Sequence, residues 1–150
     1  MKTLARQRDK AEVLGRLRTI RPESVRRWGR MSAHQMVCHL ADSFRMALGK
    51  PMKQTGGLYE RTVVKWIALY SPVPWPPALV TSPEIDQEGA GTRPVDFAED
   101  VAQVEALLER VTAPTRALAQ RHPVFVSMSD AAWLRWGYLH TSHHLRQFGA

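Results

Sequence analysis

The sequence predicts a single all-α domain, a four-helix bundle with a short extra N-terminal helix and one long crossover loop. Apolar residues recur at the three- and four-residue spacing of amphipathic helices in five segments. No segment shows the sustained alternation of polar and apolar residues that a strand requires. Helices of this kind bury their apolar faces by packing on one another. The length of 150 residues suits one domain with its own core, so we assign residues 1–150 to one domain.

The first two predicted helices lie before residue 50. Residues 3–19 form a weakly patterned leading helix, which ends before Pro22. The second helix covers Ser32–Leu48, because Ser32 and Gln35 have capping-box spacing at its start and Gly49 follows its end.

The third predicted helix covers Leu58–Tyr70 and is strongly apolar. A long irregular stretch, Ser71–Val95, follows it and is rich in proline and glycine. Connections of this length are uncommon in compact domains and are often functional. The stretch is therefore either a loop that covers one end of the bundle near a site, or a passive crossover between distant helix ends.

The fourth predicted helix begins at Asp96, which has Glu99 at capping spacing, and its apolar pattern runs to Val111. Pro114 kinks or breaks it, and a weak pattern continues through Leu118. Residues 122–128 are expected to be extended or looped. Ser129 caps the last helix, which continues to the end of the chain.

The last helix carries two histidines on one face. His140 and His144 are one turn apart, and at about 100° per residue they point the same way. The same face carries further apolar and polar residues, namely Trp133, Trp136, Gly137, Gln147 and Phe148. Two imidazoles at this spacing can bind one metal ion from a rigid helix. The third ligand is predicted to be His39, at the edge of the apolar face of the second helix.

Three neutral imidazoles would hold a divalent ion and leave a position open for water or substrate, as in catalytic zinc sites. Such an ion keeps its full charge, so it can lower the pKa of bound water or hold a thiol as the thiolate. The other interpretation is that each histidine is a partly buried polar residue without a ligand. Burying two imidazoles beside two tryptophans without a partner is costly, which favours the metal site.

Four nearby residues have roles that the pattern leaves open. His143 could replace His144 as a ligand, because residues three apart also share a helix face. We prefer His144, which lies nearer the centre of the face. Gln147 could hydrogen-bond a ligand histidine or the exchangeable ligand, or only contact solvent. Asp42 could orient the imidazole of His39, or be a surface acid. Cys38 is expected to be a small buried residue with no catalytic partner.

The remaining histidines, His34 and His122, lie at helix ends or in loops, and we expect both at the surface. Cys38 is the only cysteine, which fits a reducing compartment. No apolar run is long enough for a membrane span, and the N-terminus does not resemble a signal peptide. We therefore expect a cytoplasmic protein that does not enter a membrane.

The net charge of +7 comes entirely from residues 1–30, which contain ten basic and three acidic residues. Such a segment can bind nucleic acid, but it lacks interleaved aromatic residues and a helix-turn-helix pattern. We favour a solvated helix and loop, and we expect residues 1–10 to be dispensable for the fold.

Two stretches resemble the DinB/YfiT-like superfamily of metalloenzymes, in particular a branch that is mostly uncharacterised. One is Trp28 to Ser43, where that superfamily places a ligand histidine at the position of His39. The other is Trp133 to Gly149, which matches its last-helix pattern of His-x-x-x-His followed by Gln at His140, His144 and Gln147. A weaker likeness covers residues 91–100.

The resemblance implies an up-down-down-up four-helix bundle, frequent homodimers and a three-histidine site for zinc, nickel or a similar ion. Characterised relatives include S-transferases and a maleylpyruvate isomerase that use small thiols such as bacillithiol, mycothiol or glutathione. One departure is Leu145, which stands where many members have arginine directly after the second motif histidine.

The sequence thus predicts a divalent-metal-dependent enzyme that acts on a small-molecule substrate, with a low-molecular-weight thiol as cosubstrate and S-transfer as its reaction. One alternative is a metal-dependent hydrolase that uses bound hydroxide, although no glutamate stands next to either motif histidine. Another is a non-enzymatic bundle that binds nucleic acid through its basic N-terminus.

Overall fold

The computed structural model describes residues 1–54, 57, 59–77 and 83–150, and these residues are mostly helical. The α-helices are α1 (Gln7–Leu17), α2 (Ala33–Ala47), α3 (Lys65–Tyr70), α4 (Phe97–Thr112) and α5 (Asp130–Gln147). The smaller elements are a π-helix η1 (Glu60–Val64), a 3-10 helix η2 (Pro83–Ile85), and the strands β1 (Arg121–His122) and β2 (Val126–Ser127). The all-α class is confirmed at this level, whereas the four-helix bundle stays a prediction.

The predicted starts of α2, α4 and α5 are confirmed by their caps, whereas the leading helix α1 is shorter than the predicted residues 3–19 and has no side-chain cap. Ser32 accepts from the Gln35 backbone and the Gln35 side chain bonds back to Ser32, so the capping box of α2 is complete. Asp96 accepts from the Glu99 amide at the start of α4, and Ser129 caps α5 in the same way. At the other end of α4, helical structure stops at Thr112, and the weak pattern up to Leu118 is not helical.

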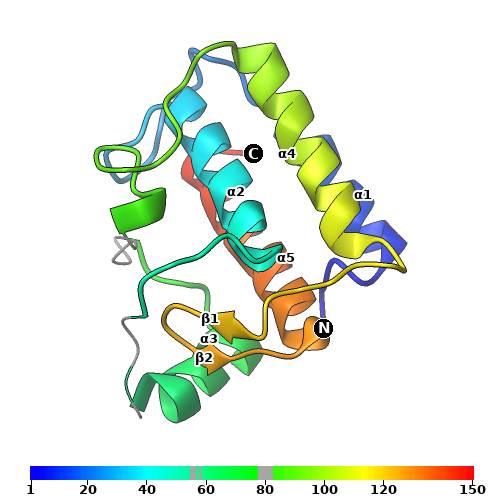
Figure 1. The fold of residues 1–150 in the computed structure, drawn as a ribbon. Helices are drawn as coiled ribbons and strands as arrows, with labels where there is room; N and C mark the ends of the chain where they lie inside the picture. The colour runs from blue at the N-terminus through cyan, green and yellow to red at the C-terminus, as the bar shows by residue number, and fades with distance from the viewer. Residues whose placement is uncertain (55–56, 58, 78–82) are drawn as a thin grey trace.

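The helices α1, α2, α4 and α5 lie side by side, with α3 and the β1–β2 hairpin at one end (Figure 1). Helix α2 packs on both α4 and α5, and α1 packs on α5. Their apolar faces form one core. No helix in the described part of the chain is both long enough and apolar enough to cross a membrane.

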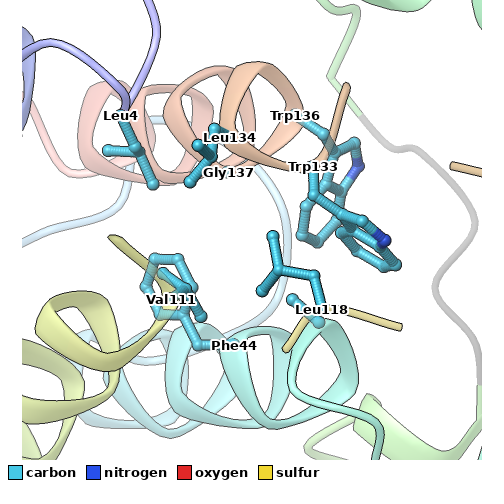
Figure 2. A pocket seen from close by; sticks show the side chains of 9 residues that line it. Leu4, Phe44, Val111, Leu118, Trp133, Leu134, Trp136 and Gly137 are labelled. Atoms are coloured by element: carbon cyan, nitrogen blue, oxygen red, sulfur yellow. The ribbon is translucent and has the colours of Figure 1, made fainter. Parts of the chain in front are cut away.

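The N-terminal segment is part of this core, which contradicts the reasoning that residues 1–10 carry too little apolar pattern to matter for the fold. Leu4 is 2% exposed, and its amide donates to the Leu134 carbonyl at 3.1 Å. Figure 2 shows Leu4 facing the interior near Leu134 of α5, across from Phe44 and Val111. The polar residues around Leu4 hid this contact, because a single apolar side chain has no periodicity.

The residues drawn in Figure 2 line a small apolar void of about 10 Å³ in the core. A cavity of this size is at the lower limit for one water molecule, and its lining offers no polar partner. It is therefore a packing defect of the core and not a substrate site.

The third predicted helix differs from its expectation. Residues 59–70 are helical, but η1 occupies the first half and α3 has only six residues, while Leu58 lies outside the described residues. Within α3 only Leu69 is buried. Large apolar side chains of this region are exposed, namely Tyr59, Val63, Trp66, Ile67, Tyr70 and Val73. The apolar residues of this predicted helix are thus mostly exposed in the chain and do not form a buried face.

Most of residues 122–128, expected to be extended or looped, belong to the short β1–β2 hairpin, which covers residues 121–127. His122 in this hairpin is 6% exposed, so the expectation of a surface histidine is wrong. Its ring stacks on Phe125 and lies 5.1 Å from the Trp136 ring. Its Nδ1 accepts from the amides of Val124 and Phe125 at 3.1 and 3.3 Å. The hairpin folds back onto α5, which its position in the sequence does not reveal.

Candidate metal site

The three predicted ligands meet in the core between α2 and α5. His39 comes from α2, and His140 and His144 come from α5. One ligand nitrogen from each lies within 4.8 Å of the other two. All three side chains are buried, with 2%, 9% and 9% exposure in that order. The structure therefore brings the predicted set together, and metal binding by it stays a prediction.

The spacing of the nitrogens fits a common ion. The Nε2 atoms of His39 and His140 are 3.2 Å apart. Two nitrogens at about 2.0–2.1 Å from a tetrahedral zinc ion would be about 3.4 Å apart. The His144 ring is 4.7 Å from each of the other two rings, centroid to centroid. The ligand nitrogens of the three histidines are thus close enough to share one ion after small shifts of the side chains.

The protonated nitrogen of His39 follows from its hydrogen bond. His39 Nδ1 lies 2.8 Å from the carbonyl oxygen of Ile85, which can only accept. Nδ1 therefore carries the proton and donates, and Nε2 presents its lone pair toward His140. Without an ion, the Nε2–H of His140 is the donor to that lone pair.

His144 is fixed by a longer relay. The Gln147 amide nitrogen donates to the Trp28 carbonyl at 2.8 Å, which leaves the Gln147 Oε1 facing His144. That oxygen accepts from His144 Nδ1 at 3.0 Å. His144 Nε2 is therefore also unprotonated, as a ligand must be. Gln147 therefore bonds His144 and does not only contact solvent, since it is 3% exposed, while the role of His144 as a ligand stays a prediction.

A glycine makes room for this relay. Gly29 has a positive φ of 78°, and a Cβ built there would lie 2.5 Å from the Gln147 amide nitrogen. Any side chain at this position would displace the Gln147 amide. The Trp28–Gly29 turn is thus shaped to receive Gln147.

The long irregular segment reaches the site, as the first interpretation of it required. Ile85 in η2 supplies the carbonyl that orients His39. Trp75 lies against the rings of His140 and His143, with centroids 6.2 and 6.0 Å away. Trp75 and Ile85 are therefore part of the wall of the candidate site, which favours the first interpretation over a passive crossover, while residues 78–82 of this segment lie outside the described residues.

Asp42 fixes that segment, and neither sequence interpretation of this residue holds. It is fully buried and does not bond His39. Its carboxylate accepts from the Thr92 amide at 2.7 Å, from Thr92 Oγ1 at 2.8 Å and from Arg45 Nη1 at 2.9 Å. Asp42 thus acts on His39 indirectly, by holding residues 85–92 against α2.

Electrostatics keep the three imidazoles neutral. Burial lowers the pKa of His39, and it lowers those of His140 and His144 well below the ordinary value. Each neighbouring imidazole adds a smaller effect in the same direction for His140. Neutral imidazole is the form that coordinates a metal, so the set is ready to bind near pH 7.

His143 is placed differently from His144. It is 5% exposed and lies between the rings of Trp28 and Trp75, at 5.8 and 6.0 Å. Its Nδ1 has no hydrogen-bond partner among the described residues. The nitrogens that lie within 4.8 Å of one another belong to His39, His140 and His144, which agrees with our preference for His144 over His143. His143 instead belongs to the aromatic wall beside the site.

The expectation for Cys38 holds in part, and that for His34 is wrong. Cys38 is 1% exposed, and burial raises the pKa of its thiol to about 12. Its Sγ lies 3.6 Å from Asp100 Oδ2. His34 is half-buried and bonds the same oxygen at 2.7 Å. Helix α4 covers the first turn of α2, which the position of His34 at a helix end concealed.

Three basic residues of the N-terminal segment, Lys10, Arg16 and Arg18, are engaged within the fold. Lys10 pairs with Glu109 at 2.8 Å, and Arg18 pairs with Glu105 at 2.8 Å. Arg16 donates to the Ser142 hydroxyl and to the Ala150 carbonyl. These side chains tie α1 to α4 and α5, so this part of the segment offers little free charge to a nucleic acid.

Comparison with known proteins gives one match. Residues 4–150 match the model of a family described as "Protein of unknown function (DUF1569)". No curated protein and no solved structure matches the chain. The resemblance to the DinB/YfiT-like superfamily therefore stays a prediction.

Proposed function

The chain belongs to the DUF1569 family, and from the geometry of its site we propose that it is a divalent-metal-dependent enzyme with His39, His140 and His144 as ligands. The observation that carries this proposal is the convergence of three buried nitrogens, two of them fixed as lone-pair donors by Ile85 and Gln147. Oriented ligands of this kind are typical of metal sites. Imidazole suits zinc and nickel, and these are the ions we propose.

The ligand set also favours chemistry over a purely structural role. A divalent ion bound by three neutral ligands keeps its charge and favours the anionic form of a thiol or water at an exchangeable position. Trp136 stacks on His140 with centroids 4.5 Å apart, and Trp75 covers another side. These rings exclude water from the site and leave an apolar wall for a small substrate.

We propose S-transfer as the reaction. A small thiol loses its proton to solvent, its sulfur forms a bond to an electrophilic carbon of the substrate, and the leaving group departs with its electron pair. This reaction needs no carboxylate as general base. Asp42, a buried acid on the same helix as His39, is fully engaged by Thr92 and Arg45. A DinB-like bundle, whose known relatives use small thiols, is part of the same proposal.

Metal content is the decisive measurement. Protein purified without a nickel column should contain about one ion that depends on the triad. His140→Ala should remove it, whereas His143→Ala, the matched change one turn along on α5, should retain it. Loss of the ion from the His143 variant but not from a His144→Ala variant would refute the ligand set.

The reaction is tested with cobalt in place of the native ion. Because Cys38 could add its own signal, the experiment uses the Cys38→Ser variant. Adding the correct thiol, among bacillithiol, mycothiol, glutathione and cysteine, should produce a thiolate-to-cobalt charge-transfer band and turnover of an electrophile such as monochlorobimane. Cleavage of simple esters or amides with no such band would replace S-transfer by hydrolysis.

A further inference from the structure

A second group of metal-ligating side chains lies between α2 and α4, apart from the three histidines. His34 and Cys38 are one turn apart on α2, and Asp100 faces them from α4. One ligand atom from each lies within 4.8 Å of the other two. We propose that His34, Cys38 and Asp100 form a second divalent-metal site, for a thiophilic ion such as zinc.

The distances within the cluster are near those of a tetrahedral site. Cys38 Sγ lies 3.6 Å from Asp100 Oδ2. With zinc at about 2.3 Å from sulfur and about 2.0 Å from oxygen, these two atoms would be about 3.5 Å apart. The Nε2 of His34 is closer to the same oxygen, at 2.7 Å. It would need to move out by roughly 0.6 Å to reach the spacing of two tetrahedral ligands.

The surroundings allow that movement and prepare the carboxylate. The side chains of His34 and Asp100 are 20% and 15% exposed, so an ion can enter from solvent while Cys38 lies beneath them. The Val95 amide donates to Asp100 Oδ2 at 3.3 Å, and the His34 ring packs edge-on against Phe97. Outer contacts of this kind orient metal ligands.

The charge of the cluster also matches a dication. An ion would take the place of the thiol proton of Cys38, which is released to solvent, while the ring proton of His34 moves from Nε2 to Nδ1 so that Nε2 can coordinate. One thiolate and one carboxylate then neutralise its two charges, whereas three imidazoles leave the charge intact. The second site is therefore suited to holding α2 and α4 together, and its thiolate selects a softer ion than oxygen ligands would.

The test uses the full chain with the triad disabled. Cobalt is titrated into the His140→Ala variant, followed by metal analysis after gel filtration. Cys38 is the only cysteine, so any thiolate-to-cobalt band in a protein without added thiol reports this residue. We expect one ion per chain with that band, and at least tenfold weaker binding when His34→Ala or Asp100→Ala is added.

The matched control is Asp96→Asn on the same helix, because asparagine also caps helices and Asp96 is not in the cluster. It should retain the band and the affinity. Circular dichroism checks that each variant is folded. The band is measured in the His140→Ala protein, which keeps Cys38, so the test does not depend on whether a Cys38 variant folds. A folded His140→Ala protein that binds no cobalt, or a band that survives removal of both His34 and Asp100, would overturn the proposal. Either result leaves the triad assignment intact.

Discussion

Replacing Asp42 by asparagine should destabilise the protein strongly, although the two side chains have the same shape. The carboxylate is 0% exposed and accepts three hydrogen bonds of 2.9 Å or less from Thr92 and Arg45. Asparagine has one acceptor oxygen, so its NH₂ group would face a hydrogen-bond donor of Thr92 or Arg45. The substitution would also remove the negative charge that pairs with Arg45. Hydrogen bonds to charged groups contribute about 1.5–3 kcal/mol each, and breaking a buried pair costs about 3–5 kcal/mol.

We therefore expect the free energy of unfolding to fall by about 3 kcal/mol. For a chain of this length each kcal/mol corresponds to about 2–4 °C, so the melting temperature should drop by about 6–12 °C. Urea denaturation followed by circular dichroism measures the first quantity, and a thermal scan measures the second. Because residues 85–92 orient His39 through Ile85, zinc affinity in a chelator competition should also fall by about 10–100-fold.

The control is Asp86→Asn, which removes a carboxylate from the same segment. Among the described residues, the Asp86 side chain accepts one hydrogen bond, from the exposed Glu88 amide at 3.0 Å, so its loss should cost less than about 1 kcal/mol. Burial tends to raise the pKa of Asp42, but the hydrogen bonds from Thr92 and Arg45 and the charge of Lys50 together outweigh burial and lower it. Its contribution is therefore present above the unfolded pKa of about 3.9 and is lost as pH falls through the lower folded value. If Asp42→Asn melts within about 2 °C of the unaltered protein at pH 7, the anchoring role is refuted.

Three further predictions concern the packing around the site. Burial lowers the pKa of His122 to about 3, below its unfolded value, so its contribution to stability should be complete above about pH 6.5 and should fall by about 2 kcal/mol between pH 7 and 5. Urea titrations at both pH values check this, because the loss of stability between them should be about 2 kcal/mol smaller in His122→Gln than in the unaltered protein. Leu4→Ala should cost about 3 kcal/mol, and deletion of residues 1–10 should give insoluble or unfolded protein, read by circular dichroism; a truncated chain that melts normally would contradict the packing of Leu4. Gly29→Ala should displace Gln147 and weaken zinc binding by about tenfold with little loss of helix, and unchanged affinity would show that the relay to His144 does not matter.

Most of the helices and the shared face of His140 and His144 could be predicted because both depend on local periodicity. The capping residues of α2, α4 and α5 stand where the sequence placed them, and the spacing of His140 and His144 alone defines a shared face. His39 is the only ligand whose meeting with the others required a tertiary argument, namely that α2 packs against α5.

The features that escaped prediction depend on contacts between distant segments. Thr92, which donates two hydrogen bonds to Asp42, lies fifty positions away in an irregular segment, and the Ile85 carbonyl has no sequence pattern at all. His122 is buried because a two-residue strand pair turns it toward Trp136. Periodicity carries no information about such contacts, because the residues that make them do not belong to repeating faces.

The position of the two helices along the chain gives the candidate metal site a mechanical consequence. His39 and His140 are 101 positions apart, so an ion bound to both would close a loop comprising most of the chain. A permanent crosslink around a loop of about 100 residues restricts the unfolded chain by about 4.7 kcal/mol in the chain-entropy model. A coordinated ion would act as a removable version of that crosslink, formed without oxidation and opened by a chelator or by acid. Resistance to proteolysis would then follow the supply of metal.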